Sequence, residues 1–142
     1  MTVATYDPKQ VAITIGTHVV SGFGEDTFVA VEANEDLWSL TVGAGGDAAR
    51  SKSNNLSGKI TITLLQTSDS NQVLQGFLTA DQVANTGKFP ISVKDTSGLS
   101  LYASPEAWVM KSPDAPFGKT ISEREWVIEV GQLAAFTSGP TA

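Results

Sequence analysis

Two segments in which every second residue is apolar constrain this chain more than any other feature. In Lys59–Gln66, the side chains of Ile60, Ile62 and Leu64 fall on one side of an extended backbone, and threonines fall on the other. Arg124–Val130 alternates too, with Trp126, Ile128 and Val130 on one side and Glu125, Val127 and Glu129 on the other. Such a pattern predicts strands with one buried face, so the core is expected to be built from β-sheet.

Shorter segments rich in β-branched and aromatic residues recur along the rest of the chain, each bounded by Gly, Asn, Asp, Ser or Pro. This arrangement is typical of an antiparallel β-sandwich or β-barrel. Pro90 lacks a backbone N–H, so it predicts either an edge strand or a place among the first residues of its strand. The further predicted strands are Val11–Ile15, His18–Val20, Phe28–Glu32, Leu37–Val42, Phe89–Lys94, Leu99–Ala103 and Ala107–Met110.

A tight hairpin and one helix complete the predicted fold. Gly16-Thr17 separates the first two strands, and glycine in the first position favours a type II′ turn. From about Ser68 to Thr86, apolar residues recur at helical spacing and Gly87 follows as a stop signal, which predicts one flanking amphipathic helix. Capping-box spacing within it indicates a kink or break over Gly76–Thr79.

Two connections are unusually long. Gly43–Gly58 is polar and rich in glycine, and it predicts a loop of the length that is usually functional or disordered. Lys111–Thr120 contains two prolines, which rule out regular structure and predict a stiff excursion. Neither segment has the character of a domain boundary, and 142 residues suit one domain, so residues 1–142 are expected to form a single domain.

Composition removes several classes of function. The chain has no cysteine, which excludes disulfides, thiolate metal sites, cysteine nucleophiles and iron–sulfur clusters. Its net charge of -6 opposes binding to nucleic acid through phosphate contacts. The sequence contains no apolar run long enough for a membrane span and no secretion signal at the N-terminus, so we expect no membrane insertion and a cytosolic origin.

The sequence offers no convincing catalytic, cofactor or metal site. His18 is the only histidine and lies in a predicted hairpin strand, where a surface or half-buried position explains it better than a catalytic triad. Adjacent carboxylates at Glu25-Asp26 and Glu35-Asp36 are better explained as turn and surface residues than as a glycosidase pair. Gly43–Gly46 lacks the lysine of a phosphate-binding loop. We therefore expect no enzyme activity, no cofactor and no metal.

Negative charge is concentrated in the first third of the chain. Between Gln10 and Ala49 there is no lysine or arginine, whereas six acidic residues occur there: Glu25, Asp26, Glu32, Glu35, Asp36 and Asp47. Two interpretations stay open, a solvated face that aids solubility and a negative field with a function.

Four motifs, in order, resemble a family of phage structural proteins that form the tail tube of some contractile-tailed phages. They are YDPKQVAITIG from Tyr6, FVAVEANEDLW from Phe28, VGAGGDAAR from Val42 and SGKITITLLQTSDSN from Ser57. The resemblance implies the tube fold, shared with the secreted ring protein of type VI secretion: a barrel or sandwich with one flanking helix, assembled as stacked hexameric rings. It also implies a virion protein of the phage tail, assembled in the host cytoplasm.

The resemblance also implies partners and contact residues. The partners are further copies of the chain, the tail sheath protein, a baseplate or tube initiator protein and a tail terminator protein, while DNA passes through the lumen without specific binding. Exposed strand edges would pair between subunits to form a continuous wall. The expected inter-ring contacts in the loop Gly43–Gly58 are Gly43, Gly45, Gly46, Asp47, Arg50, Lys52, Asn54 and Asn55. Within such a tube, the acidic first third of the chain supplies the expected lumen-facing acids, Glu25, Asp26, Glu32 and Glu35, with Glu125 and Glu129 as rivals.

Other functions remain as alternatives. A secreted carbohydrate-binding β-sandwich would use exposed Trp38, Trp108 and Trp126 as stacking platforms, although in a protein of this size all three are expected in the core. The missing secretion signal and missing cysteines also count against that function. Within the structural class, a type VI ring protein and a tube initiator near the baseplate stay open.

Overall fold

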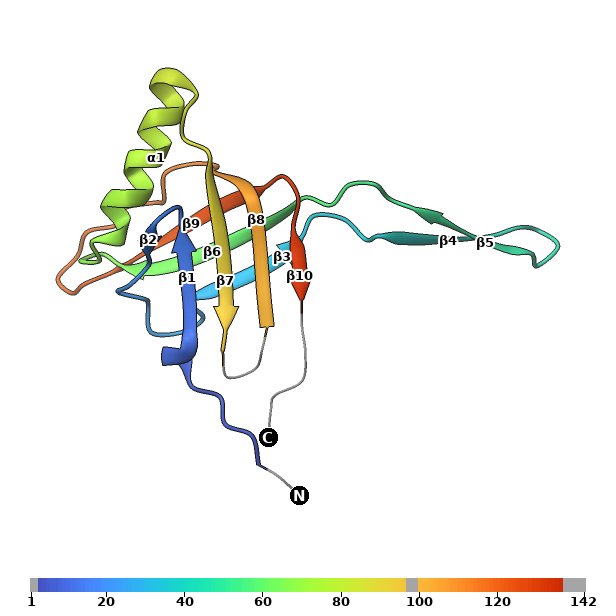
Figure 1. Ribbon diagram of the computed structural model, residues 1–142, viewed down its shortest axis with the longest axis horizontal. Coiled ribbons are helices and arrows are strands. Elements are labelled where there is room, and N and C mark those ends of the chain that lie inside the picture. The colour runs from blue at the N-terminus through green and yellow to red at the C-terminus, as the bar shows by residue number, and fades with distance from the viewer. Residues whose placement is uncertain (1–2, 97–99, 137–142) are drawn as a thin grey trace.

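The computed structural model describes residues 3–96 and 100–136, and within them the fold is mostly antiparallel β-sheet with one α-helix (Figure 1). The predicted fold class is therefore confirmed. The strands are β1 (Val11–Ile15), β2 (His18–Val19), β3 (Val29–Ala33), β4 (Trp38–Val42), β5 (Ala48–Lys52), β6 (Gly58–Leu65), β7 (Phe89–Asp95), β8 (Ser100–Val109), β9 (Glu123–Val130) and β10 (Ala134–Phe136). The helices are a 3-10 turn η1 (Pro8–Gln10) and α1 (Ser70–Ala84).

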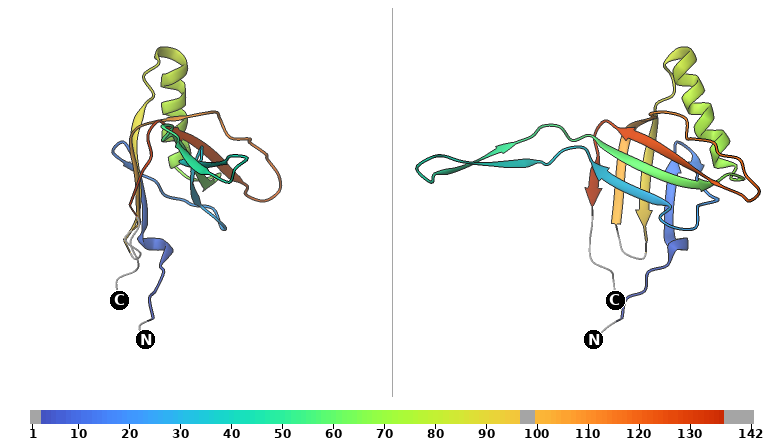
Figure 2. Two further views of the ribbon diagram at one scale, coloured as in Figure 1. Left: turned by 90° about the vertical axis from the view of Figure 1, so that its right-hand side faces the viewer. Right: turned by 180° about the vertical axis from the view of Figure 1, so that it is seen from behind.

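The main sheet runs in the order β2-β1-β7-β8-β9-β6-β3 and folds over at β8 into two layers (Figure 2). The fold occurs because β8 changes partner along one edge. Its first half pairs with β10, for example Ala103 with Ala134, whereas its last residues pair with β9, for example Val109 with Ile128. One layer therefore contains β2, β1, β7, β8 and β10, and the other contains β9, β6 and β3.

The core lies between the two layers and follows the predicted alternation. Ile60, Ile62 and Leu64 of β6 have no exposed surface, and Ile128 of β9 is equally buried beside them. Ile13 of β1 faces them from the other layer and is also fully buried. Fully burying such a side chain stabilises a fold by about 1.5–3 kcal/mol, so these alternating strands supply the main driving force for folding.

Helix α1 covers one end of the core. Its apolar face buries Leu74 and Leu78, and the Phe77 ring lies 4.5 Å from the Phe89 ring of β7. The helix runs without interruption through Gly76, so the predicted break was wrong. An added side-chain carbon at Gly76 would meet nothing within 4 Å, and the helical hydrogen bonds tolerate a glycine on this open face.

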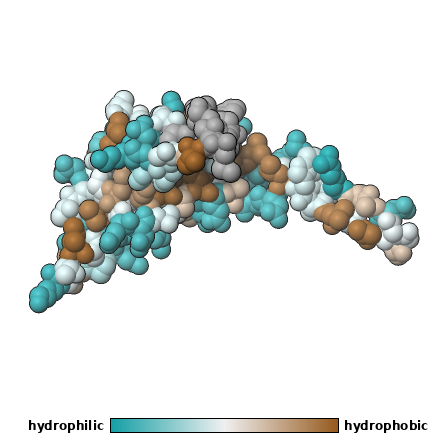
Figure 3. Space-filling view, turned by 90° about the horizontal axis from the view of Figure 1, so that it is seen from below, coloured by the Kyte–Doolittle hydropathy of each residue, from teal (hydrophilic) through white to brown (hydrophobic). Residues whose placement is uncertain are grey.

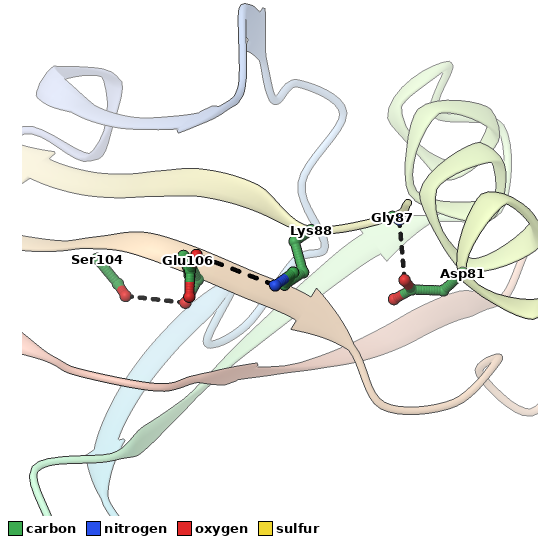
Figure 4. A network of polar contacts seen from close by, with 5 residues as sticks. All are labelled: Asp81, Gly87, Lys88, Ser104 and Glu106. Carbon is green, nitrogen blue, oxygen red and sulfur yellow. Dashed lines mark hydrogen bonds and ion pairs between the residues drawn. The ribbon is translucent and has the colours of Figure 1, made fainter. Parts of the chain in front are cut away.

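The end of α1 is fixed by a tight turn that leads into β7. Asn85 adopts a left-handed conformation with φ of 56°, which ends the helix. The Gly87 N–H then donates to Asp81 Oδ1 at 2.8 Å (Figure 4). A Cβ at Gly87 would lie 2.1 Å from the Phe77 carbonyl oxygen, so only glycine fits there. Beyond the turn, Lys88 Nζ lies 4.0 Å from Glu106 Oε1 on β8, an exposed ion pair of small energetic value.

Several detailed predictions are confirmed. The hairpin β1–β2 has the predicted two-residue turn, with φ of 61° at Gly16. Pro90 is the second residue of β7, at a register shift in the pairing with β8, so β7 is an inner strand and the second of the two explanations for Pro90 holds. Lys111–Thr120 contains no helix or strand, and Arg124 Nη2 ties it down by donating to the Pro116 carbonyl at 3.4 Å.

Two strand predictions need correction. The segments Leu99–Ala103 and Ala107–Met110 were predicted as two strands, but the structure has one continuous strand, β8. It continues past Pro105 because it pairs with β7 on one side and with β10 and then β9 on the other. Leu99 itself lies outside the described residues. The second correction concerns Gly43–Gly58, which is not a long loop, because β5 occupies its middle and pairs with β4.

Candidate assembly surfaces

The hairpin β4–β5 projects from the two-layered body as a separate two-stranded arm (Figure 1). At its tip the Gly43 N–H donates to the Asp47 carbonyl at 2.7 Å, and the Gly46 N–H donates to the Gly43 carbonyl at 3.0 Å. Gly46 has φ of 89°, a conformation that favours glycine. Five cross-strand pairs join β4 to β5, and every residue of both strands is exposed.

The two faces of the arm differ in chemistry. One face carries Trp38, Leu40 and Val42 of β4 together with their cross-strand partners Lys52, Arg50 and Ala48, whereas the other face carries only serine, threonine and alanine. Leu40 and Val42 are 70% and 58% exposed. Apolar side chains gathered on a projecting arm, visible in Figure 3, are typical of a surface that a partner covers.

Two of the three tryptophans lie outside the predicted core: Trp38 on the arm and Trp108, which is half-buried on β8. The prediction of a core position is confirmed for Trp126, which is 2% exposed, but Trp38 on the arm is 46% exposed. The Arg50 guanidinium lies 3.9 Å above the Trp38 ring, a cation–π contact that covers one ring face and holds the arginine in place. That contact leaves the ring less available as a platform for a sugar.

A polar neck joins the arm to the body. The Asn55 amide donates to the Glu35 carboxylate, and the Ser53 N–H donates to the Leu37 carbonyl at 2.8 Å, which extends the strand pairing below β4. Asn34 Nδ2 donates to Glu129 Oε1 at 2.5 Å and so ties the neck to β9. These bonds give the arm a defined direction.

The predicted contact residues therefore occupy three places on one arm. Gly43, Gly45, Gly46 and Asp47 form its tip, and Arg50 and Lys52 lie on its apolar face. Asn54 and Asn55 lie in the neck. Sequence reasoning missed Leu40 and Val42, although the alternation in Leu37–Val42 already showed that this strand has two unlike faces.

The predicted lumen acids do not gather on one surface. Glu32 lies on the outward face of the layer β3-β6-β9, in cross-strand register with Lys59, which in turn lies opposite Glu129. Glu123, Glu125 and Glu129 of β9 point to the same side, since they alternate with buried residues. The rival acids thus share a face with Glu32. Glu25 lies next to this face, since its N–H donates to Glu123 Oε1 at 3.4 Å, and Glu35 lies in the neck of the arm.

Glu25 and Asp26 line a groove of about 930 Å³ beside β1 and β2. Its apolar lining includes Val19, Phe23 and Phe28, and the two phenylalanine rings lie 4.7 Å apart. Charged and apolar groups thus meet in one open groove, which no signal in the sequence had indicated.

Among the described residues, no group of three His, Cys, Asp or Glu side chains is placed to hold a metal ion. His18 lies in β2 half-buried, as expected, with Nε2 at 2.8 Å from Ser70 Oγ. That hydroxyl also accepts the Ser21 N–H at 3.1 Å, so the contact fastens β2 to the start of α1. The helix α1 is also too short and too polar to cross a membrane, and the described chain holds no other α-helix.

Comparison with solved structures shows where this fold occurs. The chain matches a structure of the anti-feeding prophage tube-terminating cap with a TM-score of 0.65 at 12% identity, covering 97% of this chain and 95% of that one. It matches the PVC sheath/tube terminator, from an extracellular contractile injection system, with a TM-score of 0.66 at 11% identity over 96% and 100% of the two chains. A chain of the PVC sheath–tube complex gives a TM-score of 0.65 at 12% identity, over 94% and 93%. The fold is thus one found in contractile injection systems.

Sequence comparison narrows this class to a family. Residues 3–137 match the model of the bacteriophage PhiTE tail tube proteins, and the chain belongs to that family. It is also 37% identical over 135 residues to the structural protein ORF10 of Pseudomonas phage KPP10, covering 89% of this chain and 78% of that protein. The chain is therefore a structural subunit of a phage tail tube and not an enzyme, as the motifs in the sequence had indicated.

Proposed function

We propose that copies of this tail tube protein form hexameric rings that stack into a channel for DNA ejection. The observation that carries the proposal is the projecting arm β4–β5. In an isolated subunit its Leu40 and Val42 side chains stay exposed to water, so they contribute little hydrophobic stabilisation. A tube is a heterologous assembly, in which each copy offers complementary patches to its neighbours and the stack extends along its axis. Similarity to tube terminators and to a sheath–tube complex supports this arrangement.

Contacts within a ring use the free edges of the sheet. Strands β3 and β10 each pair on only one side among the described residues, and β2 is too short to offer a useful edge. An unpaired strand edge presents N–H and C=O groups that a neighbouring strand can satisfy. Pairing from copy to copy would continue the sheet around the ring and give the tube a wall of β-structure.

The lumen lies against the outward face of β3-β6-β9. That face carries Glu32, Glu125 and Glu129 together with Glu123, against Lys59 as its one cation on these strands. The outward face of the other layer carries Ala12, Thr14, Ser92, Lys94 and Ala103, and its one acid on these strands, Glu106 of β8, is paired with Lys88. The two layers thus give a subunit one acidic side and one nearly neutral side.

An acidic lumen suits the passage of DNA. DNA is a polyanion that binds basic surfaces by releasing counterions, so a basic wall would retain it. A row of glutamates instead repels the phosphates and lets DNA transit without specific binding. In this proposal Glu32 and the rival acids line the lumen, while Glu25 and Asp26 belong to the groove beside β1 and Glu35 belongs to the neck of the arm.

The arm makes the inter-ring contact. Its tip of Gly43, Gly45, Gly46 and Asp47 is farthest from the body, and Arg50 and Lys52 on its face add charge. The neck holds the arm at a fixed angle, so a ring can meet the next ring without first ordering a loop. Residues 1–142 act as one domain in this scheme, and the sheath, baseplate or initiator and terminator proteins meet the finished tube, assembled in the host cytoplasm.

Negative-stain electron microscopy of the purified chain, over a series of concentrations and salt conditions, tests assembly directly. Rings or stacked tubes with an open channel are expected. Particles that stay monomeric even when a preformed tube end is added as a seed would contradict the proposal.

Labelling then tests which layer faces the lumen. The chain has no cysteine, so Glu125→Cys places one thiol on the acidic face, and Lys94→Cys is the matched variant on the other layer. In assembled tubes, a small maleimide should label both variants. A maleimide on a large polymer should label only Lys94→Cys, and equal labelling by the polymer would refute the lumen assignment.

A further inference from the structure

The groove beside β1 and β2 has no assigned role in the body of the protein. It is open on one side, its lining includes Val19, Phe23 and Phe28, and Val19 is 61% exposed. An apolar groove of about 930 Å³ exposed to water favours a partner with matching apolar side chains.

The groove and the arm have opposite charges. The charged side chains that line the groove are Glu25 and Asp26, with Lys9 as the cation. On the arm, Arg50 and Lys52 are the cations and Asp47 is the acid. Each charge on one surface thus has a counterpart of opposite sign on the other, and such complementarity selects partners and fixes register.

The apolar parts also match in kind. The arm offers Leu40 and Val42 from a flat two-stranded ribbon, and the groove offers Phe23, Phe28 and Val19. Arg50 is already held above Trp38, so little side-chain freedom is lost when it pairs with a carboxylate.

The two surfaces cannot meet within one subunit. In Figure 1 the arm leaves one side of the body, while β1, β2 and the segment that follows them lie toward the opposite side. Five-residue strands give the arm a reach of about 17 Å at about 3.4 Å per residue, enough to enter a neighbour but not to fold back. A contact between two unlike surfaces on opposite sides of a subunit can repeat from copy to copy and extend the assembly, instead of ending in a symmetric dimer.

We propose that the apolar face of the arm of one copy lies in this groove of a second copy. Leu40 and Val42 then cover Phe23 and Phe28, and Arg50 and Lys52 pair with Glu25 and Asp26. This inference rests on the proposed function, because it names the site that receives the inter-ring arm.

Charge reversal provides the first test. One variant, Arg50→Glu with Lys52→Glu, has two acidic surfaces, and a second, Glu25→Lys with Asp26→Lys, has two basic surfaces. Each alone should associate at least about tenfold more weakly than the original chain, because like charges then meet at the contact. Mixed together, the two should co-assemble with alternating copies, since each arm again meets a groove of opposite charge. Circular dichroism and thermal unfolding check that both variants fold.

Disulfide trapping provides the second test. The chain with Leu40→Cys and Val19→Cys should form a ladder of linked copies when assembled tubes are oxidised. The matched control carries Ser39→Cys, on the opposite face of the arm, with Val19→Cys, and should form at least about tenfold less ladder.

The outcomes separate this inference from the proposed function. If the original chain forms tubes but the mixed variants do not co-assemble and no ladder forms, the groove receives some other partner and the inference is wrong, while the tube proposal stands. If the original chain forms no tube even when seeded, the proposed function fails and this inference fails with it.

Discussion

Replacing Leu40 by threonine should weaken assembly about tenfold without destabilising the folded subunit. Threonine is β-branched and suits a strand, so the arm itself should persist. Burying a leucine fully contributes about 2 kcal/mol, and Leu40 still has 70% of its surface exposed, which leaves about 1.4 kcal/mol to be gained on assembly. A loss of about 1.4 kcal/mol corresponds to about a tenfold change in the association constant.

The assay compares two quantities for the same variant. Sedimentation at a series of protein concentrations gives the concentration above which tubes form, which should rise about tenfold. Urea unfolding of the unassembled chain gives the free energy of unfolding, which should change by less than about 0.5 kcal/mol, as for other exposed positions. Ser39→Thr, on the opposite face of the arm, is the control and should change neither quantity. An unchanged assembly concentration for Leu40→Thr would refute the reasoning.

Three further predictions concern the body and its charge. Gly87→Ala should lower the free energy of unfolding in urea by about 3 kcal/mol, because the new Cβ would lie 2.1 Å from the Phe77 carbonyl oxygen. Gly76→Ala, where the new Cβ meets nothing, should raise it by about 0.5–1 kcal/mol. Similar effects of the two substitutions would contradict the steric argument. Trp126→Phe removes the 2.9 Å hydrogen bond from Nε1 to Asn71 Oδ1 and should lower the free energy of unfolding by about 2–3 kcal/mol in the same assay. A change near zero would show that water replaces the hydrogen bond. Raising salt from about 10 to 150 mM shortens the screening length from about 30 to 8 Å. Because the chain has a net charge of -6, weaker repulsion between copies should increase tube formation, measured by light scattering. A steady decrease would mean that the few ion pairs across the contact outweigh the overall repulsion.

The layered core could be predicted from the sequence because burial imposes a period on the residues. Ile60, Ile62 and Leu64 alternate with threonines because one side of β6 faces the core, and that constraint is written into the local pattern. The helix was predicted for the same reason. Its continuity through Gly76 was not predicted, because the local capping signal favoured a break, whereas packing of the helix on the core keeps it continuous.

The hairpin β4–β5 was half predicted, and the reason is physical. Trp38–Val42 alternates and was expected as a strand, but its partner Ala48–Lys52 reads as a polar loop, because neither side of β5 packs on the core. Because β5 has no alternation of its own, its pairing with β4 can be recognised only once the backbone hydrogen bonds are seen.

The assembly surfaces were the least predictable part, because their constraint lies in another copy of the chain. Glu25 and Asp26 stood out in the sequence only as negative charge, and the fold then divided the acidic residues between a groove and the outer face of β3-β6-β9. Alternation of apolar and polar residues indicates that a strand has two different faces, but it does not identify the surface that each face contacts. For a subunit built to repeat, the informative comparison is therefore between unlike surfaces of one chain, and here the arm and the groove match in charge and in apolar character.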